Sequence, residues 1–289
     1  METWATRQSG PLAAFRDILV AVTEEGRGDE PETALGYGLT FAATAGSHLT
    51  VQSAARRLTM VGGAGLGFVN DLVAGENRRL RILAQSVAER VAGDAASAGV
   101  TCTTEAPALA YPDLIARVTA RARLADLTVL DAESREADLD RDLIDGVLFG
   151  SGRPLVVVPA GRSAFSARRV VVAWDGSAQA ARAANDALPF LRAAEAVEIV
   201  SVVGEKDLSA SAAGAEFAPH LARHGVNVSV NVLPVVDDVA ETLRAQVGLF
   251  RADMLVMGAY RHPRLQEWFL GGATRSLLTR SPVPLFLAH

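Results

Sequence analysis

Three glycines near the carboxyl end of the chain lie where a phosphate cradle could form, after a strand and before a helix. Gly258 follows the apolar run 252–257, and the pair Gly271-Gly272 comes directly before a helical pattern. Glycine has no Cβ, so backbone N–H groups in such segments approach an anion closely. The amino terminus of a helix adds N–H groups without intrahelical partners and the positive end of the helix dipole. This stretch therefore predicts a phosphate-binding site.

A carboxylate is expected at the same edge of the fold. The apolar run 169–174 is followed by Asp175-Gly176-Ser177, which puts Asp175 just past the end of a strand. Open α/β sheets bind ligands outside the carboxyl ends of their strands. The alternative interpretation of residues 175–177 is a tight turn followed by a helix N-cap, with no part in ligand binding. The residues alone leave both interpretations open.

Short Val-, Ile- and Leu-rich runs alternate with helical patterns along the whole chain, which is typical of a parallel sheet covered on both faces. We expect strands at 15–22, 48–54, 100–106, 125–131, 154–159, 169–174, 197–203, 226–233, 252–257 and 283–288. We expect helices at 30–45, 76–98, 112–123, 138–149, 178–192, 211–224, 237–250 and 273–279. Such a sheet would bring the glycines and Asp175 together at one edge.

The order of these elements repeats, which indicates duplicated domains. The sequence matches are 18–22 with 170–174, 98–100 with 224–226, 125–127 with 252–254, and 153–155 with 283–285. We therefore predict an α/β fold of two tandem five-stranded parallel-sheet sandwiches of Rossmann-like type, with domains at 1–161 and 162–289. Their last strands would pair within the chain, giving a pseudo-twofold body and hiding two sheet edges.

The first half carries an insertion. Ile18 matches Val170, 152 positions later, whereas Gly99 matches Gly225, 126 positions later, so the first half holds about 26 extra residues. Most of them fall at 56–75, a stretch with few periodic signals. Its glycine-rich run 63–67 lacks the spacing of a dinucleotide-binding loop and is interpreted as a flexible insertion. It is one surface for a homodimer or for another protein partner.

Composition excludes several classes of protein. The 289 residues suit two domains of ordinary globular composition, and a net charge of −5 disfavours binding to nucleic acid or to an acidic membrane. No run of apolar residues is long enough to span a membrane, and the amino terminus lacks the pattern of a signal peptide. Cys102 is the single cysteine and is expected to be packed or half-buried. We expect a cytoplasmic protein.

The carboxyl-terminal stretch resembles the signature of universal stress proteins of the UspA type. In members that bind ATP the pattern is Gly, two residues, Gly, nine residues, Gly and a small polar residue. Gly258 and Gly271 have this separation, and the helix and last strand agree with it. The resemblance implies ATP, with Mg²⁺ accompanying it. It implies a cofactor site formed by Ala173, Asp175, Val202, Val203, Met257, Gly258, Arg261, Gly271, Gly272, Ala273 and Thr274.

Within that resemblance, Asp175 would contact the adenosine part, and Val202 and Val203 would line the base pocket. Met257 and Gly258 would pack against the nucleoside. Backbone N–H groups of Gly271, Gly272 and Ala273 would bind the phosphates, and Thr274 would add a hydroxyl group.

The chain departs from the pattern at two positions. Arg261 replaces the second glycine, and Gly272 stands where Ser, Thr or Asn is usual. An arginine would strain the loop if position 261 requires a positive φ, and would grip a phosphate if it does not. A solvated loop arginine is the third interpretation.

The first half keeps the frame without this chemistry. Thr23-Glu24-Glu25 follows its first strand, Asp131 takes the place of the glycine, and 133–145 is rich in acidic residues. Carboxylates repel phosphates, so we predict no triphosphate there. The other interpretation of the acidic run is a solvated helix start.

Other motifs are weaker. His220 and His224 lie four residues apart but have no evident third metal ligand, so they are interpreted as surface histidines. Ser177 lacks the elbow of a hydrolase nucleophile, and no Walker motif is present. Asp237-Asp238 is expected to cap the following helix.

Three hypotheses follow. The first is a stress-response sensor or regulatory module that binds an adenine nucleotide and turns it over slowly if at all. The second is a related protein that binds no nucleotide and acts through protein contacts. The third is an adenylating enzyme. The lack of an SGGxDS-type loop argues against this hypothesis.

Overall fold

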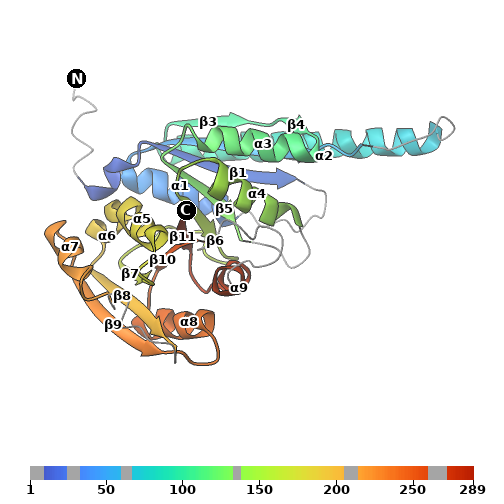
Figure 1. The fold of residues 1–289 in the computed structure, drawn as a ribbon. Helices are drawn as coiled ribbons and strands as arrows, with labels where there is room; N and C mark the ends of the chain where they lie inside the picture. Colours follow the sequence, from blue (N-terminus) through green and yellow to red (C-terminus); the bar gives the residue numbers. More distant parts are fainter. Residues whose placement is uncertain (1–9, 25–32, 60–66, 133–137, 205–213, 260–271) are drawn as a thin grey trace, which may run out of the picture.

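A computed structural model of the chain describes residues 10–24, 33–59, 67–132, 138–204, 214–259 and 272–289. Two of the predicted site residues, Arg261 and Gly271, lie outside these ranges. Within them, strands and helices alternate in the α/β arrangement that the sequence predicts (Figure 1).

The described strands form one continuous sheet, in the order β3-β2-β1-β5-β6-β11-β10-β7-β8-β9, with β4 also paired to β2. The first half supplies β1 (Asp17–Glu24), β2 (His48–Arg56), β3 (Cys102–Glu105), β4 (Ala108–Leu109), β5 (Leu127–Asp131) and β6 (Leu155–Val158). The second half supplies β7 (Arg169–Ala173), β8 (Ala196–Val203), β9 (Val228–Pro234), β10 (Met254–Gly258) and β11 (Leu285–Ala288).

The two halves meet at the pair β6 and β11, which is antiparallel, with Phe286 opposite Val156. Pairs on either side of this junction are parallel, and the strand order of one half mirrors that of the other. The prediction that the last strands pair within one chain is therefore confirmed. The pairing removes two sheet edges, each of which would otherwise expose a row of unpaired backbone groups.

Helices cover both faces of the sheet. One core lies against α1 (Thr33–Ala45), α2 (Gly67–Ser97), α5 (Ala178–Asp186), α6 (Leu188–Ala193) and α7 (Ala218–Arg223). The other lies against α3 (Tyr111–Ala122), α4 (Asp138–Gly150), α8 (Val239–Phe250) and α9 (Gly272–Arg280). A short 3₁₀ helix, η2 (Pro11–Ala14), precedes β1. Each core contains residues of both halves, so the halves share their hydrophobic interior.

Aromatic rings join the halves on the α1 face. Phe190 of the second half is fully buried, with ring centroids 4.8 Å from Phe15 and 5.2 Å from Phe41. Its ring also lies 5.7 Å from that of Phe286 on β11. Tilted and edge-to-face pairs at these separations are favourable beyond the area that they bury.

The repeated Ala-Asp pair of the sequence sets the strand register. Asp126 Oδ2 accepts hydrogen bonds from the N–H groups of Arg16 (2.7 Å) and Asp17 (3.1 Å), at the start of β1. In the second half Asp253 Oδ2 accepts one from Arg169 N–H (2.9 Å), at the start of β7. Each carboxylate therefore satisfies backbone donors where two neighbouring parallel strands begin.

Two helices differ from the sequence-based prediction. The predicted helix 178–192 is divided at Ala187 into α5 and α6, because Pro189 lacks the N–H that would continue the helical bonding. Helix α7 begins at Ala218, and residues 211–213 of the helix predicted at 211–224 lie outside the described residues.

The insertion is helical in its second part. Helix α2 begins at Gly67 and runs for 31 residues, so it takes in residues 67–75 of the segment that the sequence presents as irregular. Figure 1 shows this helix (cyan) extending past the sheet. Asp71, Leu72, Ala74 and Gly75 are exposed there, so the extension has little of the buried stripe on which periodicity-based prediction depends. Among the described residues, no helix has the length and apolarity that crossing a membrane requires.

Candidate functional site

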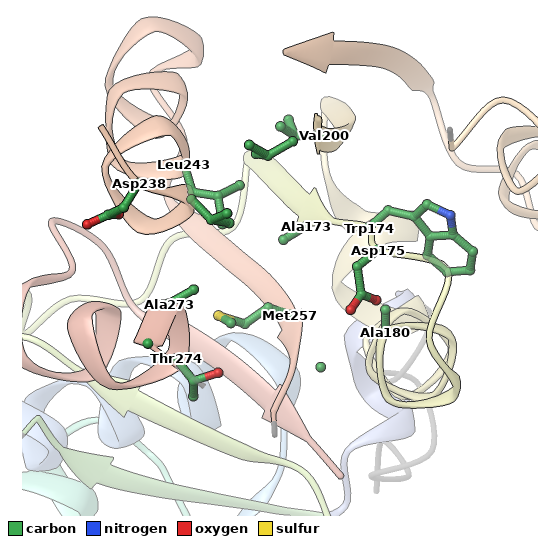
Figure 2. Close-up of a pocket in the computed structure, with 14 residues that line it drawn as sticks. Ala173, Trp174, Asp175, Ala180, Val200, Asp238, Leu243, Met257, Ala273 and Thr274 are labelled. Atoms are coloured by element: carbon green, nitrogen blue, oxygen red, sulfur yellow. The ribbon is translucent and has the colours of Figure 1, made fainter. Parts of the chain in front are cut away.

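A cavity of about 580 Å³ opens at the carboxyl ends of β7, β8 and β10. This is the edge at which open α/β sheets bind ligands, and the volume lies in the range of small-molecule sites. Figure 2 shows that α8 and α9 close one side and that β7 and α5 form the other. The cavity is lined by Ala173, Trp174, Asp175, Ala180, Val200, Val202, Asp238, Val239, Leu243, Met257, Gly258, Gly272, Ala273 and Thr274.

The fold brings most of the predicted site residues together at this cavity. Those that line it are Ala173, Asp175, Val202, Met257, Gly258, Gly272, Ala273 and Thr274. Val203 ends β8 and is half-exposed but does not line the cavity; the preceding residue, Val202, does. The positions of Arg261 and Gly271 lie outside the described residues, so their predicted contacts with phosphate stay predictions.

Asp175 forms the turn that the sequence offered as an alternative to ligand binding. Its Oδ1 accepts a hydrogen bond from Ser177 N–H (2.9 Å), and Gly176 has a φ of 73°. Ser177 Oγ in turn accepts one from Ala180 N–H (3.1 Å) and caps α5. The turn and cap are therefore real, and they hold the exposed Asp175 carboxylate at the rim of the cavity. Both interpretations of this segment are compatible, because the bond to Ser177 uses only one carboxylate oxygen.

Gly258 is required by close packing. A Cβ on this residue would lie 2.4 Å from Ala180 N and 2.5 Å from Gln179 C, both in the first turn of α5. Only glycine lets the end of β10 approach the backbone of α5 so closely. The contact fixes the floor of the cavity between Asp175 and Met257.

An apolar wall faces this floor. Val200, Leu243 and Met257 are buried and belong to both the cavity and the core on the α8 face. Val200 and Leu243 are absent from the sequence-based site. Val200 is two residues before Val202, so strand alternation puts both on one face, which is a usable signal. Nothing local marks Leu243, since it reads as an ordinary core position of α8.

Asp238 is a second carboxylate that the sequence assigned only to helix capping. The capping role is confirmed: Asp238 Oδ1 accepts a hydrogen bond from Glu241 N–H (2.7 Å) at the start of α8. The residue also lines the cavity, on the side opposite Asp175 in Figure 2. Its contribution depends on how α8 lies against β10 and β7, which the sequence does not specify.

Helix α9 presents its amino terminus to the cavity. Gly272 is exposed, with open space where a Cβ would lie, and Ala273 and Thr274 line the wall beside it. The first N–H groups of a helix have no intrahelical acceptors and carry the positive end of the dipole. An anion is therefore favoured at α9, and hydroxyl or amino donors are favoured at the two aspartates.

In the first half, described side chains occupy the corresponding place. By strand register Asp131 occupies the position of Gly258, and it accepts a hydrogen bond from Ala34 N–H (2.8 Å) at the start of α1. Tyr111 is the first residue of α3, and its equivalent in the second half is Val239, the first residue of α8. Asp142 is the equivalent of Gly272, because the two lie equally far from the ends of α4 and α9. The Tyr111 hydroxyl donates a hydrogen bond to Asp142 Oδ2, across the place where a ligand would enter.

Two other features singled out in the sequence have ordinary structural contacts. The His220 ring contacts those of Phe217 and His224, and His220 pairs with Asn185, as expected of histidines near a helix end. Cys102 is half-buried, and burial raises the pKa of its thiol. The described residues contain no cluster of three or more His, Cys, Asp or Glu side chains that could hold a metal ion.

Comparison with known proteins shows what the sequence and the fold are similar to. The sequence model of the Universal stress protein family matches residues 166–289. A universal stress protein from Archaeoglobus fulgidus DSM 4304 has a TM-score of 0.67 and 17% identity, over 94% of this chain and 97% of that chain. A functionally unknown protein from Pseudomonas aeruginosa PAO1 has a TM-score of 0.58 and 15% identity, over 97% and 94%. No curated protein matches the chain.

These comparisons define the class of protein. Residues 166–289 form a domain of the universal stress protein family. The chain as a whole has the Rossmann-like fold of the solved universal stress protein, with its second half repeating the architecture of its first.

Proposed function

We propose that the second half of the chain binds an adenine nucleotide, ATP by family resemblance, in the cavity between α8, α9 and β7. The supporting observation is that one cavity combines an apolar wall, two carboxylates and a helix amino terminus. The protein would act as a cytoplasmic stress-response sensor or regulatory module, in which the bound nucleotide changes contacts with a partner.

The chemistry of the cavity orients the nucleotide. The adenine ring fits the wall of Val200, Leu243 and Met257, where burial of its faces is favourable. Ribose hydroxyls or the adenine amino group would donate to Asp175 or Asp238. The phosphates belong at α9, away from these carboxylates, because like charges repel strongly where water is partly excluded.

Turnover is expected to be slow. Phosphoryl transfer needs a positioned water or base and metal ions that neutralise the developing charge. The described residues supply no metal-binding cluster, so any Mg²⁺ would be bound mainly through the phosphates.

The test is the nucleotide content of protein purified without added ligand, followed by titration with ATP. Gly272 is the position to change, because the space around it is open and a side chain there leaves the fold intact. Gly272→Asp places a carboxylate at the phosphate end and should weaken ATP binding at least about tenfold. Gly272→Ser is the matched control, since a small polar residue is usual there in the family, and it should bind as well as the parent or better.

Saturable ATP binding that is lost in Gly272→Asp and kept in Gly272→Ser would support the proposal. Absence of binding at millimolar ATP would overturn it and favour a protein that acts through protein contacts alone. Equal binding by all three proteins would place the nucleotide away from α9 and contradict the proposed orientation.

A further inference from the structure

Four arginines surround a second cavity, in the first half of the chain. This cavity of about 330 Å³ lies where β2 ends and α2 passes over it. Arg56 and Arg57 come from the end of β2, and Arg78 and Arg81 from two successive turns of α2. Among the described residues, no acidic side chain lines the cavity. It has no residue in common with the cavity of the second half.

The walls of this cavity are held in place by contacts that do not involve a ligand. Ala55 packs against Leu80 and Ala84 of α2 in a small buried cluster. Asn77 accepts a hydrogen bond from Leu58 N–H (2.7 Å) and donates one to Leu58 O (3.0 Å). The segment after β2 is therefore tied to α2, and a ligand would meet arginines that are already close together.

Three of these arginines are not neutralised by carboxylates of the described residues. Within the described residues, Arg57, Arg78 and Arg81 have no ion pair with a carboxylate. The nearby Glu76 is engaged with Arg79, at 2.6 Å to 3.1 Å, and Arg79 does not line the cavity. The concentration of positive charge stands out in a chain with a net charge of −5. Like charges around one cavity repel, and a bound anion would offset that repulsion.

The arginines suit phosphate groups and leave no place for a base. A guanidinium presents its donors in a planar fork that matches phosphate oxygens. The Arg56 guanidinium covers the ring of Tyr111, with its Cζ 5.1 Å from the ring centroid. That contact orients Arg56 and removes the ring as a stacking surface. Several cations around a small cavity favour a ligand with more than one phosphate.

We propose that this cavity binds a small polyphosphate anion, held by Arg57, Arg78 and Arg81 and by the oriented Arg56. The site lies at the carboxyl end of β2, on the ligand-binding edge of the sheet. In the first half, Asp131 and the bond from Tyr111 to Asp142 occupy the place that corresponds to the cavity of the second half. The first half would thus bind phosphate beside α2 instead. This inference does not depend on nucleotide binding in the second half.

The test is calorimetric titration of the full chain with inorganic tripolyphosphate at low ionic strength. The variant carries Arg78→Gln and Arg81→Gln together; both residues are exposed on α2, so the fold should be unaffected. Its dissociation constant should rise at least about tenfold, because two charged donors are lost. Arg79→Gln is the matched control: it removes one charge from the same helix outside the cavity, and binding should stay within about twofold of the parent.

Three results would overturn the proposal. The first is absence of saturable tripolyphosphate binding, and the second is an equal loss of binding in Arg79→Gln, which would indicate attraction to the helix as a whole. The third is an oligonucleotide that binds more tightly than tripolyphosphate through the same pair of arginines, which would make the surface a nucleic-acid contact. AMP, which carries a single phosphate, should not compete with tripolyphosphate for the arginine cavity.

The two sites are separable by experiment. Gly272→Asp should leave the tripolyphosphate titration unchanged, and this agreement would support two independent sites. A parallel loss in that variant would overturn the assignment to the arginine cavity, because it would place the anion at α9 instead.

Discussion

Asp131 and Gly258 stand at the same register position in the two halves, and each faces the first turn of the helix that follows its half's first strand. Asp131 reaches that turn through its carboxylate, which accepts the Ala34 N–H at 2.8 Å. Gly258 approaches the turn with its backbone, in a space that even a Cβ would overfill. Asp131 thus places a carboxylate of the protein itself at the amino terminus of α1, whereas Gly258 leaves the cavity beside α5 open.

Replacement of Asp131 should destabilise the first half. Asp131→Ala removes an acceptor for the first turn of α1 and should lower the free energy of unfolding by about 1 kcal/mol, within the usual range of about 0.5–2 kcal/mol for helix caps. Asp131→Asn keeps a side-chain oxygen, so its free energy of unfolding should fall by less than that of Asp131→Ala. Urea denaturation of the three proteins measures both. Equal losses would show that this hydrogen bond does not stabilise α1.

Gly258→Ala should be destabilising, because the new Cβ meets backbone rather than a mobile side chain. We expect a loss of about 1–3 kcal/mol, as is typical of overpacking, together with weaker ATP binding as α5 is displaced from the cavity. Gly248→Ala is the control, since Gly248 is exposed on α8 with open space around it. That substitution should stabilise the protein by about 0.5–1 kcal/mol. Thermal unfolding of both variants shows whether each is less stable or more stable than the parent.

Phe190→Ala tests the shared core. The ring is fully buried between elements of both halves, so its loss should cost about 3–5 kcal/mol. Phe149→Ala, at a ring that is 42% exposed, should cost less. Because the halves share one sheet and both cores, we expect the parent to unfold in a single transition by circular dichroism and by fluorescence. Two separate transitions would contradict the description of one cooperative body.

The Cys102 thiol should react slowly. Burial raises its pKa, so at any pH below that value a smaller fraction is thiolate than in a free cysteine. We expect alkylation by iodoacetamide near neutral pH to be slower than in the unfolded chain and to accelerate as pH rises. The rate in denaturant is the control. Equal rates in the folded and unfolded protein would show that the thiol is not protected.

The order of elements, the parallel sheet and the duplication were predictable from the amino-acid sequence. Local patterns carry this information, because buried strands read as apolar runs and glycines mark the ends of helices. The turn at Asp175 and the cap at Asp238 were likewise predictable, since each involves residues two or three positions apart. The same holds for the glycine at the end of β10.

The tertiary structure alone decided how distant residues meet. The place of Leu243 and Asp238 at the cavity depends on the packing of α8, and the bond from Tyr111 to Asp142 joins two helices. The arginine cavity likewise forms only because α2 crosses the end of β2. Such contacts arise from side chains far apart in the chain, whose separation no local periodicity encodes. The sequence therefore specified the scaffold, and the packing of helices on the sheet decided which charges share a cavity.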